Sequence, residues 1–155
     1  MIYQDPLTGL HNRRFYEDEI GRLKTIQDEP IALIMADVNG LKETNDSLGH
    51  YEGDKILEKV GYIFKKACRA EEKIARIGGD EFVILMPRTS YVGAEELKKR
   101  IRRLIANENK KGVVVSISMG SAVKRDKSMN MEDVFKVAEE DMYRNKALDK
   151  KQSCP

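Results

Sequence analysis

The amino-acid sequence predicts a single α/β domain with a mixed central β-sheet flanked by helices. Its 155 residues suffice for one domain with a full hydrophobic core. Segments with helical spacing of apolar residues alternate with short apolar segments of strand length, and neither a repeat nor a low-complexity linker separates them. The apolar run at 31–38 is typical of a central strand covered on both faces.

Each element follows from its local pattern. Helices are expected where apolar residues recur every three or four positions, and strands where β-branched residues form short runs or alternate with polar ones. Asn12 is a suitable cap for the first helix, and Pro30 ends the polar connection that follows it. In order, the sequence predicts a helix after Asn12, a strand at 31–38, a helix from about His50 to Arg69, strands at 73–77 and 82–86, a helix around 94–105, a strand at 113–123 and a helix around 131–142.

Composition narrows the class of protein. The net charge of +2 is too small for bulk nucleic-acid binding. Because no apolar run is long enough to cross a bilayer and no signal peptide is evident, we expect a cytoplasmic domain without a membrane segment of its own. Cys68 and Cys154 lack the spacing of a zinc site or a disulfide framework, and His11 and His50 are too few for a histidine-based centre. Carboxylates are therefore the expected carriers of any metal chemistry.

The run Arg76-Ile77-Gly78-Gly79-Asp80-Glu81-Phe82 predicts a β-hairpin with two carboxylates at its bend. Two glycines between strands suit a two-residue primed turn, in which both central residues need positive φ. Acidic residues next to buried strands need a cationic partner, such as a divalent metal. The sequence of this segment is equally compatible with an ordinary solvent-exposed hairpin.

Asp37 stands at the end of the predicted central strand and is followed by a glycine-containing turn. The carboxyl ends of strands are common ligand sites in α/β sheets, and free N–H groups in such a turn can hold phosphate oxygens. If the hairpin lies beside this strand, Asp37, Asp80 and Glu81 converge into an oxygen site suited to Mg²⁺. The alternative roles for Asp37 are a helix cap or the partner of a buried arginine such as Arg76.

Taken together, the motifs resemble the GGDEF family of diguanylate cyclases over nearly the whole chain. The resemblance implies the fold of that family, similar to nucleotidyl cyclases and the palm of polymerases. Five blocks carry it in the order and spacing of the family: residues 5–14 (DPLTGLHNRR), 37–46, 49–54 (GHYEGD), the Gly-Gly-Asp-Glu-Phe signature at 78–82, and 138–146 with Met142-Tyr143.

The resemblance implies that two GTP molecules condense to cyclic di-GMP and two pyrophosphates, with Mg²⁺ as cofactor and Mn²⁺ as its alternative. By position, Asp37, the Val38 carbonyl, Asp80 and Glu81 would hold the metal. Asp80 ranks first as the base that accepts the proton of the attacking hydroxyl. The division of roles between Asp80 and Glu81 stays open.

The same resemblance assigns the GTP contacts. Asn45 and Asp54 would recognise guanine, because a carboxylate can accept from guanine N1–H and its exocyclic amine, a donor pair that adenine lacks. Gly78 and Gly79 would let the backbone approach the nucleotide. The remaining contacts implied for GTP are Gly40, Leu41, Lys42, His50, Lys146 and Lys150. The alternative for each lysine is an ordinary solvated surface residue, and the alternative for His50 is a residue that starts a helix.

Three departures from the family pattern stand out. Asn39 and Leu41 replace the common Asp and Phe. Activity is expected to survive, because the backbone of that loop binds the phosphates. Lys150 replaces an Arg, which exchanges a bidentate fork for a point charge and should weaken triphosphate binding. At the product-inhibition site, Arg69 is present but Glu72 stands for Asp, so feedback inhibition by cyclic di-GMP is expected to be impaired.

One GTP per domain implies that catalysis needs a second copy of the domain in a transient homodimer. The chain, residues 1–155, is expected to be one GGDEF domain, a fragment of a longer protein in which a sensor or receiver domain, membrane-bound or not, brings two copies together. A catalytically silent module that senses GTP or cyclic di-GMP is the alternative hypothesis. Asp54 disfavours an adenylyl or mixed-dinucleotide cyclase.

Overall fold

Four strands and the helices around them make up the described part of the chain. The computed structural model describes residues 2–24 and 27–153, with side chains as far as Asp149, so that Cys154 lies outside the described residues. The elements are α1 (Arg13–Leu23), β1 (Ile31–Val38), α2 (Leu41–Leu48), α3 (His50–Ala67), β2 (Lys73–Arg76), β3 (Glu81–Met86), α4 (Tyr91–Asn109), β4 (Ile117–Lys124) and α5 (Met131–Ser153).

The local expectations are confirmed for most elements. The Asn12 side chain accepts a hydrogen bond from the Phe15 N–H, so it caps α1 as predicted. All eight residues of β1 are buried, as expected of a central strand. The sequence interpretation missed α2, which was expected to be a loop, and placed the start of the last strand too early, since β4 begins at Ile117.

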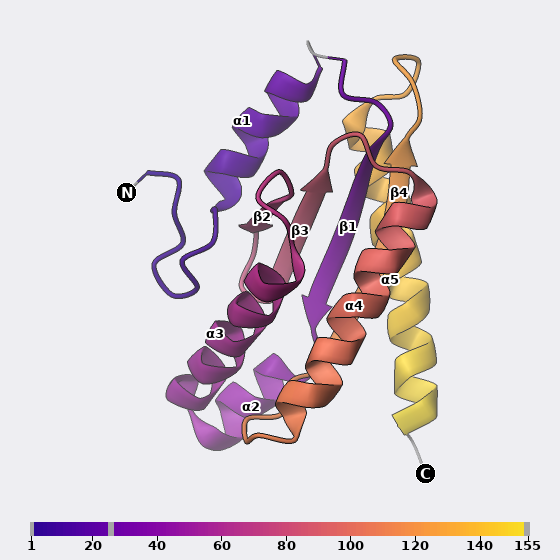
Figure 1. Cartoon of the computed structure of the whole chain (residues 1–155). Coiled ribbons are helices and arrows are strands. Elements are labelled where there is room, and N and C mark those ends of the chain that lie inside the picture. The colour runs from indigo at the N-terminus through magenta and orange to yellow at the C-terminus, as the bar shows by residue number, and fades with distance from the viewer. Residues whose placement is uncertain (1, 25–26, 154–155) are drawn as a thin grey trace.

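The sheet has the strand order β2-β3-β1-β4, and every neighbouring pair is antiparallel (Figure 1). The expectation of a mixed sheet was therefore wrong. Helical crossovers do join parallel strands here, namely β1 to β2 and β3 to β4. However, each crossover skips one position, so that an antiparallel strand lies between the two strands it connects, as in split β-α-β folds.

Side-chain alternation along the strands builds a core on each face of the sheet. Ala32, Ile34 and Ala36 of β1 belong to the core under α3 and α4. The odd-numbered residues of β1 belong to the other core, which α5 and α1 cover; they are Ile31, Leu33 and Met35. Figure 1 shows α3 and α4 on one face of the sheet and α5 on the other.

Gly120 in β4 lets α5 lie directly on the sheet. A Cβ atom added there would lie 2.1 Å from the Met142 nitrogen and 2.3 Å from the Ala138 carbonyl oxygen, far closer than van der Waals contact. This close packing sets the distance between α5 and the sheet, and the later turns of α5 reach the end of β1. None of the described helices combines the length and apolarity needed to cross a membrane.

Candidate active site

The two central strands bring acidic residues to one end of the sheet. Asp37, near the end of β1, pairs with Glu81, the first residue of β3, in the antiparallel register. The Val38 N–H donates to the Asp80 carbonyl at 2.9 Å, which holds the hairpin loop against the end of β1. Because side chains alternate along a strand, Asp37 and Glu81 share the sheet face that α5 covers.

Asp37 is 6% exposed, and its two carboxylate oxygens differ in their surroundings. Oδ2 accepts a hydrogen bond from Lys146 Nζ at 2.6 Å. Oδ1 is buried and has no hydrogen-bond partner among the described residues. Burial raises the pKa of Asp37 and the neighbouring Asp80 adds to this rise, while Lys146 opposes it. The alternatives of a helix cap or an Arg76 partner are both wrong, since Gly40 caps α2 and Arg76 pairs with Asp5.

The surrounding charges are consistent with a cation site. Burial, together with the charges of Asp37, Asp80 and Glu139, raises the pKa of Glu81. Burial lowers the pKa of Lys146, but the hydrogen bond and charge of Asp37 outweigh it and the net shift is upward. An ammonium group thus already compensates part of this excess negative charge.

The carboxylates suit a hard divalent cation, but they do not form a complete set of ligands for it. Within the described ranges, no group of three or more His, Cys, Asp or Glu side chains is arranged to hold a metal ion. Mg²⁺ keeps several waters and takes only one or two carboxylates, so an incomplete oxygen set suits it. The buried, unpartnered Oδ1 of Asp37 is the clearest unsatisfied ligand atom.

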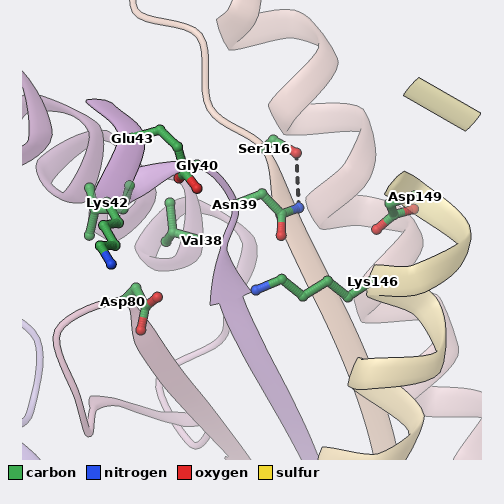
Figure 2. A pocket seen from close by; sticks show the side chains of 10 residues that line it. Val38, Asn39, Gly40, Lys42, Glu43, Asp80, Ser116, Lys146 and Asp149 are labelled. Atoms are coloured by element: carbon green, nitrogen blue, oxygen red, sulfur yellow. Dashed lines mark hydrogen bonds between the residues drawn. The ribbon is translucent and has the colours of Figure 1, made fainter. Parts of the chain in front are cut away.

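A cavity of about 500 Å³ opens beside these carboxylates (Figure 2). Figure 2 shows Lys146 extending from α5 toward the end of β1, with Lys42 and Asp80 on the opposite side. The residues that line it are Val38, Asn39, Gly40, Leu41, Lys42, Glu43, Asp80, Ser116, Lys146 and Asp149. The lining mixes cationic and anionic groups, as a site for a metal-bound polyphosphate requires.

The turn between β1 and α2 forms part of the cavity wall through Gly40, Leu41 and Lys42. Gly40 is the N-cap of α2 and has φ of 74°, a left-handed conformation that favours glycine. Leu41 and Lys42 form the first turn of α2, where N–H groups have no partner within the helix. Leu41 is buried in the core, so it anchors the turn by packing. The start of a helix, rather than the expected loop, therefore supplies the candidate phosphate-binding amides.

The residues expected to recognise guanine lie on the neighbouring pair α2 and α3, outside the cavity lining. Asp54 is exposed, and His50, also exposed, is the first residue of α3. Asn45 Oδ1 is buried without a partner among the described residues. A Cβ atom on Gly53 would lie 1.8 Å from that oxygen, so only glycine at position 53 lets Asn45 keep this position.

The hairpin differs from the predicted two-residue turn. The last paired residues are Arg76 and Phe82, so the connection is longer than two residues, and neither Gly78 nor Gly79 has positive φ. A Cβ atom on Gly79 would meet nothing within 4 Å, whereas one on Gly78 would lie 2.9 Å from Glu81 Oε1. Glycine at 79 is therefore not required by the fold, which leaves open space for a ligand there.

Arg76 ties the hairpin loop to the N-terminal segment. Its Nη2 and Nε atoms donate to the Gly79 carbonyl at 2.8 and 3.2 Å, and Nη1 donates to Asp5 Oδ1 at 3.1 Å. Arg13 adds a bond from its Nη1 to the Ile77 carbonyl at 3.1 Å. These bonds fix the loop that carries Asp80.

The residues expected at the product-inhibition site lie in the turn after α3. Arg69 is exposed, and its N–H donates to Glu72 Oε1 at 2.7 Å, so the Glu72 carboxylate is engaged within its own turn. The side chain of Lys150 lies outside the described residues, and its expected phosphate contact stays a prediction.

The structure adds residues to the site that the sequence interpretation missed. Asp149 lies on α5 three positions after Lys146, and this spacing on one helix face was an available signal. Ser116 gave no such signal, because only the strand register brings it to the site. Gly53 stood within the 49–54 motif, but only the packing of α2 on α3 shows that it makes room for Asn45.

Comparison with known proteins matches residues 2–152 to the family described as "Diguanylate cyclase, GGDEF domain". The chain is 28% identical over 153 residues to the probable diguanylate cyclase DgcT of Escherichia coli (strain K12), covering 94% of this chain and 34% of that protein. It is 31% identical over 152 residues to the response regulator PleD of Caulobacter vibrioides, covering 92% of this chain and 34% of PleD. The chain thus spans about a third of the length of these relatives.

The fold has close counterparts among solved structures. The GGDEF domain of DgcB from Caulobacter crescentus, in complex with c-di-GMP, superposes with a TM-score of 0.85 at 25% identity, covering 95% of this chain and 91% of that domain. The family match and the structural similarity agree. This chain therefore belongs to the GGDEF family of diguanylate cyclase domains.

Proposed function

We propose that this chain is the catalytic domain of a diguanylate cyclase, which joins two GTP molecules into cyclic di-GMP and releases two pyrophosphates. The observation that carries the proposal is the buried, unpartnered Oδ1 of Asp37, a residue that pairs with Glu81 in the strand register. The adjoining cavity is lined by Asp80 and by two lysines, Lys42 and Lys146. Names of relatives and of the DgcB complex support the same activity.

The chemistry follows from the residues at the sheet edge. The 3′-hydroxyl oxygen of each GTP forms a bond to the α-phosphorus of the other, while the bond from that phosphorus to the α–β bridging oxygen breaks and pyrophosphate leaves with the electron pair. Asp80 is proposed to accept the hydroxyl proton. Magnesium, held by Asp37, the Val38 carbonyl and the hairpin carboxylates, would neutralise triphosphate charge.

The remaining residues bind and orient the substrate. The Gly40, Leu41 and Lys42 amides, together with the Lys42 and Lys146 ammonium groups, are proposed to hold the phosphates. Asn45 and Asp54 are proposed to select guanine. Their place outside the cavity, on the neighbouring helices, would put the base on α2 and α3 and the phosphates in the cavity.

Each domain offers one such half-site, so the attacking hydroxyl must come from a nucleotide on a second copy. We propose a transient homodimer of a cytoplasmic domain, residues 1–155, that a linked sensor or receiver region of a longer protein brings together. Activity per chain should then fall on dilution, because only the dimer is productive.

The test is incubation of concentrated protein with GTP and Mg²⁺, followed by chromatography of the nucleotides. Cyclic di-GMP is expected from the wild type and from a dimer enforced by a fused coiled coil, and not from Asp80→Ala. An enforced dimer that binds GTP without forming product would refute the cyclase and identify a sensing module.

A further inference from the structure

Asp149 places a carboxylate in the cavity proposed to hold the phosphates. It lies on α5, three residues beyond Lys146, and lines the same 500 Å³ cavity as Lys42, Lys146 and Asp80. Figure 2 shows it on α5, the helix that also carries Lys146. A negative charge at this point is opposite in sign to the lysines that would attract a polyphosphate.

A chain of hydrogen bonds holds Asp149 toward the cavity. Ser118 Oγ donates to Asp149 Oδ2 at 2.8 Å. Ser118 Oγ in turn accepts from Asn39 Nδ2 at 3.0 Å, and the same amide lies 3.0 Å from Ser116 Oγ. Ser118 is 1% exposed, so this link between the turn after β1 and α5 is buried at its centre.

We infer that Asp149 is an affinity-determining residue that weakens polyphosphate binding through its charge. This inference rests on the proposed function. The cavity lining holds three acidic side chains, Glu43, Asp80 and Asp149, against the two lysines, so an incoming polyphosphate meets net repulsion unless cations accompany it. Asp149 thus makes nucleotide capture more dependent on the metal.

The expected size of the effect follows from the exposure of Asp149. Its side chain is exposed, so solvent screens its field, and it acts on the phosphates from across the cavity rather than by contact. For a doubly charged ligand within about one Debye length, removal of one such charge should tighten binding about three- to ten-fold at low salt. The gain should shrink toward zero at about 0.5 M KCl.

The experiment compares the wild type with Asp149→Asn, which removes the charge but keeps an acceptor for Ser118. Glu140→Gln is the matched control: it makes the same change of charge on an exposed residue of α5 nine positions earlier, about 13 Å along the helix. Calorimetry measures the Kd of two probes with Mg²⁺, a non-reactive GTP analogue and inorganic tripolyphosphate. Asp149→Asn should bind both probes three- to ten-fold more tightly, and Glu140→Gln should match the wild type.

A Ser118→Ala variant separates charge from positioning. It breaks the hydrogen-bond chain but keeps the carboxylate, so it should not reproduce the tightening. If it does reproduce the tightening, or if Asp149→Asn binds like the wild type, the inference is overturned.

The two probes separate this inference from the proposed function. If the wild type binds the GTP analogue and Asp149→Asn binds it with the same affinity, only the role of Asp149 is refuted. Tightening toward tripolyphosphate without any binding of the GTP analogue refutes the proposed function and keeps the electrostatic role. A wild type that binds neither probe refutes both.

Discussion

Gly53→Ala should separate the stability of the domain from its recognition of the base. Two opposing effects act at this position. Alanine is favoured over glycine in a helix by up to about 1 kcal/mol, and somewhat less in the first turn of α3, where Gly53 lies. Against this, the new Cβ atom would meet Asn45 Oδ1 at 1.8 Å and Cγ at 2.9 Å, so the Asn45 side chain must turn away.

The displacement should cost little stability. The atoms that clash belong to one short side chain, and Asn45 Oδ1 is a buried acceptor without a partner among the described residues. Turning it toward water would relieve a desolvation penalty of about 1–3 kcal/mol, which offsets an unfavourable rotamer of about 1 kcal/mol. We therefore expect Gly53→Ala to unfold at the same temperature as the wild type or a few degrees higher.

Function should respond in the opposite direction. Under the proposed function, Asn45 donates to or accepts from guanine, and loss of one such hydrogen bond costs about 1–1.5 kcal/mol, or roughly ten-fold in GTP affinity. Calorimetric titration with a non-reactive GTP analogue and thermal unfolding measure the two effects on the same samples. Gly21→Ala is the control, because a Cβ atom there meets nothing within 4 Å and α1 also gains from the helical preference of alanine.

A double-mutant cycle tests the mechanism. If Gly53→Ala acts through Asn45, it should weaken binding no further in an Asn45→Ala background. Additive losses in the double variant, or a Gly53→Ala protein that binds GTP like the wild type, would refute the assignment of Asn45. A drop of more than about 2 kcal/mol in stability would show that the clash extends beyond one side chain.

Three further outcomes follow from the structure. Folding raises the pKa of Glu81, so the folded protein keeps this proton to a higher pH than the unfolded chain, and stability is lost as pH rises through the Glu81 titration. At pH 7, Glu81→Gln should therefore unfold at a higher temperature than the wild type, with a gain in the free energy of unfolding of less than about 1 kcal/mol. In acid the difference should vanish. An equal or lower value at pH 7 would contradict this sign. Arg76→Ala should cost about 2–3 kcal/mol in urea unfolding and most of the proposed cyclase activity, because it removes the salt-bridge partner of Asp5 and frees the Gly79 carbonyl. Lys24→Ala breaks only an exposed pair and should cost less than about 0.5 kcal/mol. Burial raises the pKa of Cys68 to about 12, so in a Cys154→Ser background its alkylation at pH 8 should be about a thousand-fold slower than that of an unfolded peptide; rapid labelling would mean that the end of α3 opens.

Local sequence patterns predicted most elements because they depend on neighbours along the chain. The Asn12 cap, the apolar run of β1 and the helical spacing in α3 and α4 each appear in the structure as expected. The failures also have local causes. Only Leu41 and Leu48 are apolar in α2, which is too few to show a helical period, and the start of the helix depends on the left-handed Gly40.

The mixed sheet and the primed turn failed for a different reason. Strand order is set by which strands exclude water from each other, and no local pattern shows that each helical crossover skips a strand. The turn at Gly78-Gly79 was predicted from composition alone, whereas the bonds from Ile77 and Gly78 N–H to the Glu81 carbonyl and from Arg76 to Gly79 select a longer loop.

By itself, the sequence determined which residue types are available to the site and on which side of each strand they lie. The positions of Asp37 and Glu81, an even number of residues from their apolar neighbours Met35 and Val83, already assign both carboxylates to one face of their strands. The tertiary structure alone decided that these strands are adjacent in a register that pairs the two acids, and that α5 packs closely enough for Lys146 to reach Asp37. The physical reason is that alternation is a property of one strand, whereas strand register and the position of α5 result from packing between segments that are separate in the sequence.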